Sequence, residues 1–277
     1  MASTDAEQAW LVRLETTMFP VIKAWFQRTG EAPLLPTAGS SLARDDQVYT
    51  RLPPSHLAYG GMVTAAEHLE LFRVAFQASR TLYPSSYFTV LRTALMGSAQ
   101  ALWVLKPSQR AERIKHALQL ARDDIRQSRN LLSVETPAEL GLDQEVIAAR
   151  NRLDQRLVEL QAATAAAGLD PGEVPDWRLN MTGMIKTVSD LVHADGRGDP
   201  HTRHGASLLW RLQSGHAHAT PSARIRQIRE DRVVQTPGGT LTGQATTSAS
   251  EVGSAAAAAV LFLNEAFRLY ELRCAAP

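Results

Sequence analysis

The chain has 277 residues, which is long enough to bury a sizeable core in one large domain or two small ones. Its hydrophobic content of 44% is ordinary for a globular protein, and its formal net charge of +1 excludes a strong overall attraction to nucleic acids, membranes or acidic partners. The single cysteine, Cys274, excludes an internal disulfide framework and is typical of a reducing compartment.

The sequence predicts neither a secretory signal nor a membrane-spanning segment. The first ten residues include acidic side chains where a secretory signal would have a basic segment followed by an apolar one. The longest apolar run covers residues 255–263, which is far shorter than the ~20 residues that span a bilayer. We therefore expect a soluble, cytoplasmic protein that does not bind a membrane.

Apolar residues recur at helical spacing through the first half of the chain. They predict helices over 4–28, 58–80, 86–105 and 108–132, with Pro20 kinking or splitting the first. The helix 86–105 is apolar on all sides and is expected to be the central, buried one. The segment 29–57, rich in proline, glycine and serine, is expected to form a long loop that is either a lid or mobile.

The second half continues the helical pattern, with one interruption. Helices are predicted over 143–167, 178–194, 204–218 and 249–274. Between the last two, the segment 219–248 alternates apolar and polar residues around the turn sequence Pro237-Gly238-Gly239, which predicts a β-hairpin insertion. The sequence thus predicts one all-α domain over 1–277, a helical bundle of about seven or eight helices with a small hairpin before the last helix.

The helix 204–218 carries the strongest candidate for a chemical site. His204, Arg211 and His218 follow one another at intervals of seven residues, and Ser207 and Ser214 share their face. An arginine can neutralise the charge of a phosphate, and a histidine can transfer a proton. The alternative is that these side chains form buried hydrogen bonds that hold helices together.

A resemblance to known proteins starts from the same helix. The segment Trp-Arg-Leu-Gln-Ser-Gly-His-Ala-His at 210–218 resembles one found in actinobacterial proteins of unknown function. Those proteins also have an apolar helix like 91–105, followed by a proline and an arginine-rich segment like 107–113. They are similar in turn to the HEPN superfamily of all-α bundles, whose metal-independent ribonucleases use an arginine and a histidine that are close in sequence.

The resemblance implies a homodimer that acts on RNA in growth arrest or phage defence, as a toxin controlled by an antitoxin or another regulatory protein. It would place Arg211 on the phosphate and make His218 the acid or base, with Ser214 and His204 orienting them. His216 also has a suitable spacing, but a step of seven residues from Arg211 returns to the same helix face and a step of five does not. No cofactor and no metal are expected for this activity.

Arg92 is the second residue of interest, because it lies in an apolar run. A buried guanidinium must find partners or bear a large desolvation cost. Glu67, Glu70 and Asp190 are the carboxylates that we expect near it. Arg92 and Glu67 would then form either a structural ion pair or a support for the site.

Two other functions remain open from the sequence. Six plausible metal ligands lie within fifteen residues, and they would suit a metal-dependent small-molecule enzyme: Asp190, His193, Asp195, Asp199, His201 and His204. A solvated polar loop explains the same cluster more simply. The other alternative is a non-catalytic helical interaction module, in which Arg211 and His218 are structural.

Overall fold

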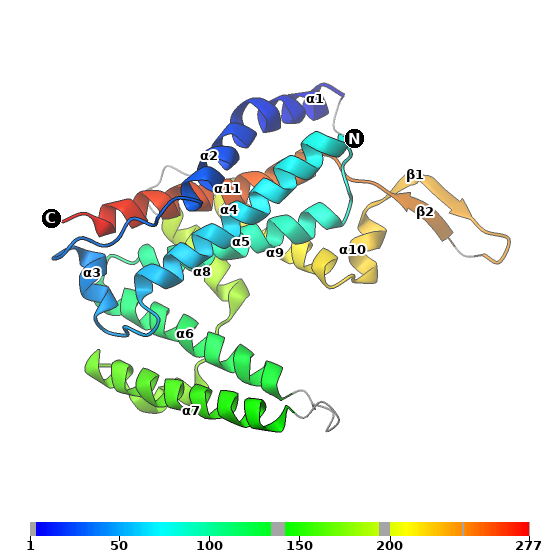
Figure 1. Cartoon of the computed structure of the whole chain (residues 1–277). Helices are drawn as coiled ribbons and strands as arrows, with labels where there is room; N and C mark the ends of the chain where they lie inside the picture. Colours follow the sequence, from blue (N-terminus) through cyan, green and yellow to red (C-terminus); the bar gives the residue numbers. More distant parts are fainter. Residues whose placement is uncertain (1–3, 134–141, 194–199, 240, 277) are drawn as a thin grey trace. The chain divides into compact units, whose positions relative to one another are not determined.

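The computed structural model describes residues 4–133, 142–193, 200–239 and 241–276. In these ranges the chain forms eleven α-helices and one two-stranded sheet, which confirms the predicted all-α class with a small hairpin before the last helix (Figure 1). The chain divides into two compact units. Unit 1 comprises residues 1–33, 59–102 and 181–268, and unit 2 comprises residues 34–58, 103–180 and 269–277.

Unit 1 begins with two helices separated by a π-helical turn. These are α1 (Thr4–Arg13), the turn Leu14–Met18, and α2 (Phe19–Thr29). Pro20 lies in the first turn of α2, where its missing N–H is not required. The proline therefore divides the expected first helix, with the wider turn immediately before it accommodating the change.

The core of unit 1 is built on α4 (Pro54–Ser79) and α5 (Ser86–Leu105). The two backbones approach closely at Gly61 and Gly97, because a Cβ atom on Gly61 would lie only 2.5 Å from the carbonyl oxygen of Gly97. Leu91, Leu95 and Leu102 of α5 are completely buried, as expected for the predicted central helix. Unit 1 therefore needs glycine at this crossing to keep its two core helices in contact.

The remaining elements of unit 1 come from the second half of the chain. They are α8 (Met181–Val192), α9 (Pro200–Ala217), α10 (Pro221–Arg226), β1 (Ile228–Gln235), β2 (Leu241–Ala245) and α11 (Ala249–Cys274). Helices α8 and α9 pack together, and the Ser189 hydroxyl of α8 donates to the Arg203 carbonyl of α9 at 2.6 Å. Strands β1 and β2 are antiparallel, with Val233 opposite Gly243, and they extend beyond α10 (Figure 1).

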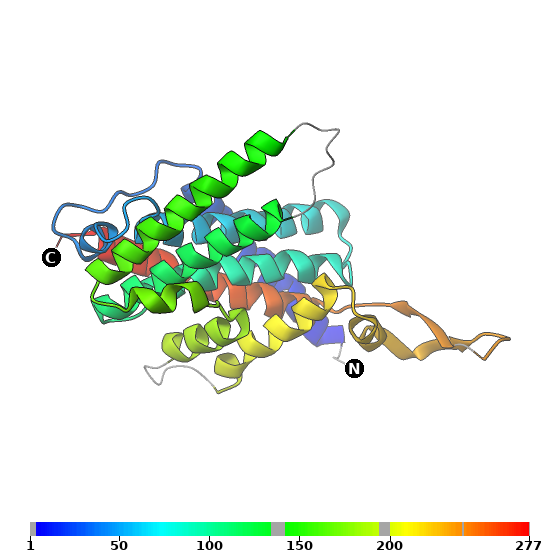
Figure 2. The same cartoon turned by 90° about the horizontal axis from the view of Figure 1, so that it is seen from below.

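Unit 2 contains α3 (Ser41–Asp46), α6 (Arg110–Leu132), α7 (Asp143–Ala166) and a short 3₁₀ helix (Pro171–Asp176). Helices α6 and α7 lie side by side (Figure 2), and their facing apolar residues form a hydrophobic core: Ile114, Leu118, Ala121, Ile125, Leu153 and Leu160. The segment 29–57, expected to be one long loop, is in fact interrupted by α3 and includes the first turn of α4. The Ser40 hydroxyl starts α3 by accepting a hydrogen bond from the Ala43 amide at 3.1 Å.

Among the described residues, two helices satisfy the length and composition of a membrane span, namely α5 and α11. In each, however, 61% of the apolar window is buried inside the protein. Burial of this extent is usual for the core helices of soluble proteins, which agrees with the expectation from the sequence.

Candidate functional site

The side chains of His204, Arg211 and His218, which we call the stripe, are exposed on α9 or at its end. His204 and Arg211 lie within the helix, and His218 follows its last residue, with its amide still donating to the Ser214 carbonyl at 3.0 Å. None of the three side chains forms a hydrogen bond or ion pair with another residue in the described ranges. The buried hydrogen bonds that a helix-tying role would require are therefore not found for Arg211 or His218.

The Ser214 hydroxyl, which lies on the same helix face, forms a hydrogen bond with Arg92. Arg92 of α5 donates from Nε to the Ser214 hydroxyl at 3.0 Å, and that hydroxyl donates in turn to the Trp210 carbonyl at 2.7 Å. The Arg92 guanidinium also lies over the Trp210 ring, 4.1 Å from its centroid. The indole N–H of Trp210 is held by Thr182 of α8 at 3.1 Å, which fixes the ring beneath the guanidinium.

The ion pair expected for Arg92 is not formed. Glu67 is exposed on α4, and Glu70 forms an ion pair with Arg73 on the same helix at 2.5 Å. Burial lowers the pKa of Arg92, and no carboxylate in the described ranges offsets that cost. The guanidinium is thus held by an aromatic ring and one hydroxyl, which leaves most of its N–H donors without a partner among the described residues.

Asp190, the third expected partner, belongs to a different contact. It accepts from Arg203 at 2.7 Å and from Lys186 at 2.9 Å, and these hydrogen bonds, the Arg203 one foremost, lower the pKa of its carboxyl. Asp195 and Asp199 lie outside the described residues, as does the side chain of His201. Within the described ranges, no three histidine, cysteine or acidic side chains come together in a way that would hold a metal ion.

A cavity of about 450 Å³ lies in unit 1 on the other flank of α9. Its walls come from α5, α9, α10 and α11, with Leu209 and Leu212 supplying apolar surface from α9. Phe88 of α5 and His216 of α9 also line it, and their rings are stacked with centroids 4.8 Å apart and planes at 17°. The volume falls in the range of small-molecule sites in proteins.

Several polar atoms at this cavity are buried without a hydrogen-bond partner among the described residues. Both amide atoms of Gln213 are in this state, and its side chain is completely buried. So are Oε1 of Gln227 and Nδ1 of His216. Burial, followed by the charge of Arg226, lowers the pKa of His216, so its imidazole is neutral near pH 7.

The stripe and the cavity use different flanks of one helix. Residues 209, 212, 213 and 216 recur at the spacing of one helical face, whereas residues 204, 211 and 218 recur at the spacing of another. Helical spacing separates His216 from His218 in the sequence, but it does not show that the face shared by His216 and Gln213 borders a cavity. In the sequence, the one indication of a buried polar group here is a glutamine that shares a helix face with Leu209, Leu212 and His216.

No protein-family model matches the sequence, and no curated protein or solved structure is significantly similar to it. The function is therefore argued from the geometry of these two flanks.

Proposed function

We propose that the protein cleaves RNA without a metal, using the exposed stripe of α9 in the manner of a HEPN-like ribonuclease. The observation that supports this proposal is that Arg211 and His218 are both exposed on one helix face and bind no other described residue. Neither side chain has a structural task in the described ranges, so both are available to a phosphodiester.

The chemistry requires few groups. Arg211 would bind the phosphate and neutralise its charge. His218 would take the proton of the adjacent ribose 2′-hydroxyl, whose oxygen attacks the phosphorus while the 5′ oxygen leaves. A histidine of a second copy would give that leaving oxygen its proton, because His204 of the same copy lies about 21 Å from His218 along the helix. The products are a 2′,3′-cyclic phosphate and a 5′-hydroxyl.

Arg92 supports the same proposal from the edge of the stripe. Its guanidinium is bonded to Ser214, which lies on the stripe face, and no carboxylate in the described ranges neutralises it. An unneutralised cation attracts phosphate more strongly than one in an ion pair. Arg92 would therefore add positive potential at Ser214, next to the proposed site.

A homodimer fits the exposed face as well. Leu208 is 59% exposed, and it lies four residues after His204 and three before Arg211, between the two on the helix surface. An apolar contact at Leu208 would bring two copies of the stripe together. As a cytoplasmic ribonuclease, such a dimer would need an antitoxin or another regulatory protein to restrain it.

The test is cleavage of single-stranded RNA by the purified protein in the presence of EDTA. We expect products with cyclic phosphate ends, and His218→Ala should lower the rate by about 100-fold or more, which is typical for the loss of a general acid or base. His56→Ala is the matched control, because His56 is exposed in the first turn of α4, which belongs to unit 2 while the rest of α4 belongs to unit 1. For Arg211→Ala the control is Arg152→Ala, an exposed arginine of α7.

The outcomes are distinct. A selective loss in the two stripe variants, with unchanged melting temperatures, supports the proposal. Cleavage that persists in His218→Ala, or no cleavage by the wild type over a panel of RNA sequences, overturns it. The second result would leave the non-catalytic interaction module as the remaining function.

A further inference from the structure

The cavity on the second flank of α9 has a polar end that the chain itself leaves unsatisfied. Gln213 is completely buried, and neither its amide nitrogen nor its amide oxygen has a partner among the described residues. Buried amides of this kind are rare in folded proteins unless a water or a ligand completes them. The cavity of about 450 Å³ beside Gln213 has room for a molecule much larger than one water.

The hydrogen-bonding capacity of this end can be counted. Gln213 offers one donor group and one acceptor whichever way its amide is turned. The amide nitrogen of Gln227 donates to the Pro84 carbonyl, which orients this side chain and leaves its Oε1 as a second acceptor. The site therefore presents two carbonyl-type acceptors and one N–H donor, together with the uncommitted Nδ1 of His216.

The charges around the cavity favour a neutral occupant. Arg226 and Glu251 both line it and are both exposed, with opposite charges. Glu251 is already used at the start of α11, where its carboxylate accepts from the Ser248 amide and the Thr247 hydroxyl, each at 2.9 Å. An ionised ligand would have no buried counter-charge among the lining residues.

The remaining walls suit a flat, apolar ring. Leu209 and Leu212 line the cavity from α9, and the stacked rings of Phe88 and His216 give it a planar aromatic surface. A polar end next to apolar walls is the usual arrangement of a small-molecule site, in which few polar groups set the orientation.

We propose that this cavity binds a neutral aromatic molecule that carries a primary carboxamide or a similar amide edge, with two N–H donors beside one carbonyl. Because both amide groups are covered in the structure, they turn toward the cavity on binding. The ligand carbonyl then accepts from the Gln213 amide nitrogen, and the two ligand N–H groups donate to the amide oxygens of Gln213 and Gln227. The aromatic ring lies against Phe88, Leu209 and Leu212. This site is separate from the proposed ribonuclease stripe and does not depend on it.

Benzamide is the probe, titrated into the full-length protein and followed by ligand-observed NMR. Acetophenone and benzoate are the matched controls, because they keep the ring and lack the N–H donors. We expect saturable binding of benzamide, and binding of either control that is weaker by about tenfold or more, since two hydrogen bonds are lost. Equal binding of acetophenone or benzoate overturns the proposal. No saturable binding of benzamide also overturns it and leaves the cavity to water.

Two variants test the assignment of residues. Gln213→Leu keeps the approximate volume and removes both orphaned atoms, so it should weaken benzamide binding by about tenfold or more while the melting temperature stays level or rises. Ser254→Leu fills the cavity from α11 and should block binding with Gln213 intact. Gln8→Leu, on the exposed surface of α1, is the control and should leave binding unchanged. Benzamide binding that survives both cavity variants overturns the assignment.

The test is independent of RNA cleavage. Gln213→Leu should leave any ribonuclease activity of the exposed stripe at the wild-type level, whereas His218→Ala should leave benzamide binding unchanged. A loss of benzamide binding in His218→Ala would overturn the separation of the two sites.

Discussion

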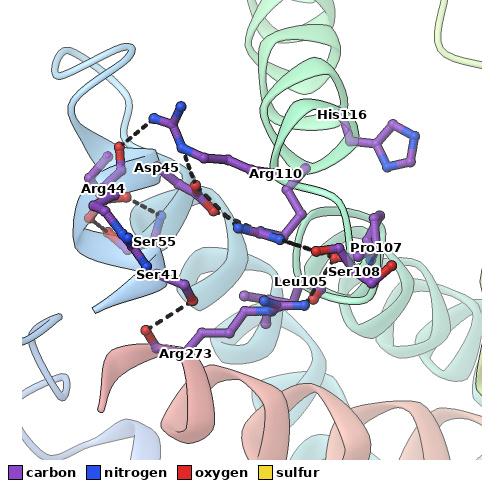
Figure 3. A network of polar contacts seen from close by, with 12 residues as sticks. Ser41, Arg44, Asp45, Ser55, Leu105, Pro107, Ser108, Arg110, His116 and Arg273 are labelled. Carbon is purple, nitrogen blue, oxygen red and sulfur yellow. Dashed lines mark hydrogen bonds and ion pairs between the residues drawn. The ribbon is translucent and has the colours of Figure 1, made fainter. Parts of the chain in front are cut away.

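Arg113 in unit 2 and Arg92 in unit 1 both lie on mainly apolar helix faces, but their polar partners differ. Arg113 is 4% exposed, and its guanidinium donates to the Asp45 carboxylate at 2.7 and 3.3 Å and to the Ser108 carbonyl at 2.9 Å. The same carboxylate also receives Arg110 (Figure 3). Within the described part of the chain, Arg92 has one hydrogen bond, to Ser214, and an aromatic ring in place of a carboxylate.

Two histidines repeat this difference. His116 in unit 2 stacks on Trp103 with ring centroids 3.5 Å apart, and its Nδ1 is 2.7 Å from the Trp103 carbonyl oxygen. His216 in unit 1 stacks on Phe88, but its Nδ1 has no partner among the described residues. In these two pairs the unit 2 residue bonds within its own unit, and the unit 1 residue retains unused hydrogen-bonding groups. The contrast belongs to these residues and not to the whole of each unit, because Arg122 Nη1 and Trp103 Nε1 of unit 2 are also buried without a partner among the described residues.

The backbone conformations at the C-terminal ends of α7 and α9 also differ between the units in residue type. Helices α7 and α9 are both followed by a residue with positive φ, and in both the amide after that residue bonds back to a carbonyl in the last turn. Unit 2 uses Gly168 there, whereas unit 1 uses Ala219. Departures from local stability rules tend to occur at functional sites, so this contrast favours α9, rather than α6 or α7, as the functional helix.

The largest predicted effect is the removal of the charge that compensates Arg113. Asp45→Asn leaves a buried guanidinium without its counter-charge and should lower the free energy of unfolding by about 3–5 kcal/mol. Urea denaturation measures it. Asp154→Asn, at an exposed pair with Arg129, is the control and should cost less than about 1 kcal/mol. Similar losses in the two variants would remove the distinction drawn for Arg113.

Acid should destabilise the protein through the two stacked histidines. Burial lowers the pKa of both His116 and His216, so in each the folded-state pKa is below the unfolded value of about 6.5. The unfolded chain then binds protons first as the pH falls. Each histidine's contribution is complete above about pH 6.5 and decreases below it, by at most ~1.4 kcal/mol per pH unit.

Glutamine variants separate the two histidines. His116→Gln and His216→Gln should each make stability less sensitive to pH between about 6.5 and 5. At pH 8, His116→Gln should also lower stability, because the bond to the Trp103 carbonyl is disturbed, whereas His216→Gln should have little effect. Thermal melts over this pH range measure both quantities, and an equal loss at pH 8 would contradict the comparison.

Replacement of Arg92 should have a smaller effect on stability than on activity. Arg92→Met removes one hydrogen bond and a cation–π contact but also removes a desolvated charge, so the net change should be within about 1 kcal/mol. If the proposed function holds, RNA affinity should fall at low salt and the salt dependence should weaken. A loss of stability as large as that of Asp45→Asn would show that Arg92 is structural.

The fold was largely predictable because the spacing of apolar residues along a helix shows which of its faces is buried. The spans 86–105 and 249–274 were predicted with the bounds that the structure has. The helix α3 was missed because it is short and because part of its support is tertiary, as in the hydrogen bond from the Ser55 amide to Asp46 at 2.9 Å.

The candidate site was predictable only in part. The spacing of seven residues placed His204, Arg211 and His218 on one helix face, but the sequence of a single helix does not show that this face is exposed. Charge alone suggested a carboxylate for Arg92, and its actual partners are the ring of Trp210 and the hydroxyl of Ser214. The sequence could not show that Gln213 is buried beside a cavity, because the other sides of that cavity come from α5, α10 and α11, which are remote in the sequence.

The smallest predicted effect concerns the positive-φ residues at the ends of α7 and α9, where alanine and glycine can each be replaced by the other. A residue with a Cβ is strained at positive φ, and glycine is not, so Ala219→Gly should raise the free energy of unfolding by about 0.5–1 kcal/mol. Gly168→Ala should lower it by about 1 kcal/mol at the equivalent position of α7. Urea denaturation of both variants against the wild type measures the pair.

The two helix ends should also differ in their effect on function. His218 directly precedes Ala219, so a glycine there changes the freedom of the residue that carries the proposed proton transfer. If Ala219 is retained because it holds His218 in place, Ala219→Gly should stabilise the protein while slowing RNA cleavage, and Gly168→Ala should do the reverse for stability with no effect on rate. A stabilised Ala219→Gly variant with an unchanged cleavage rate would show that the alanine has no role in positioning His218.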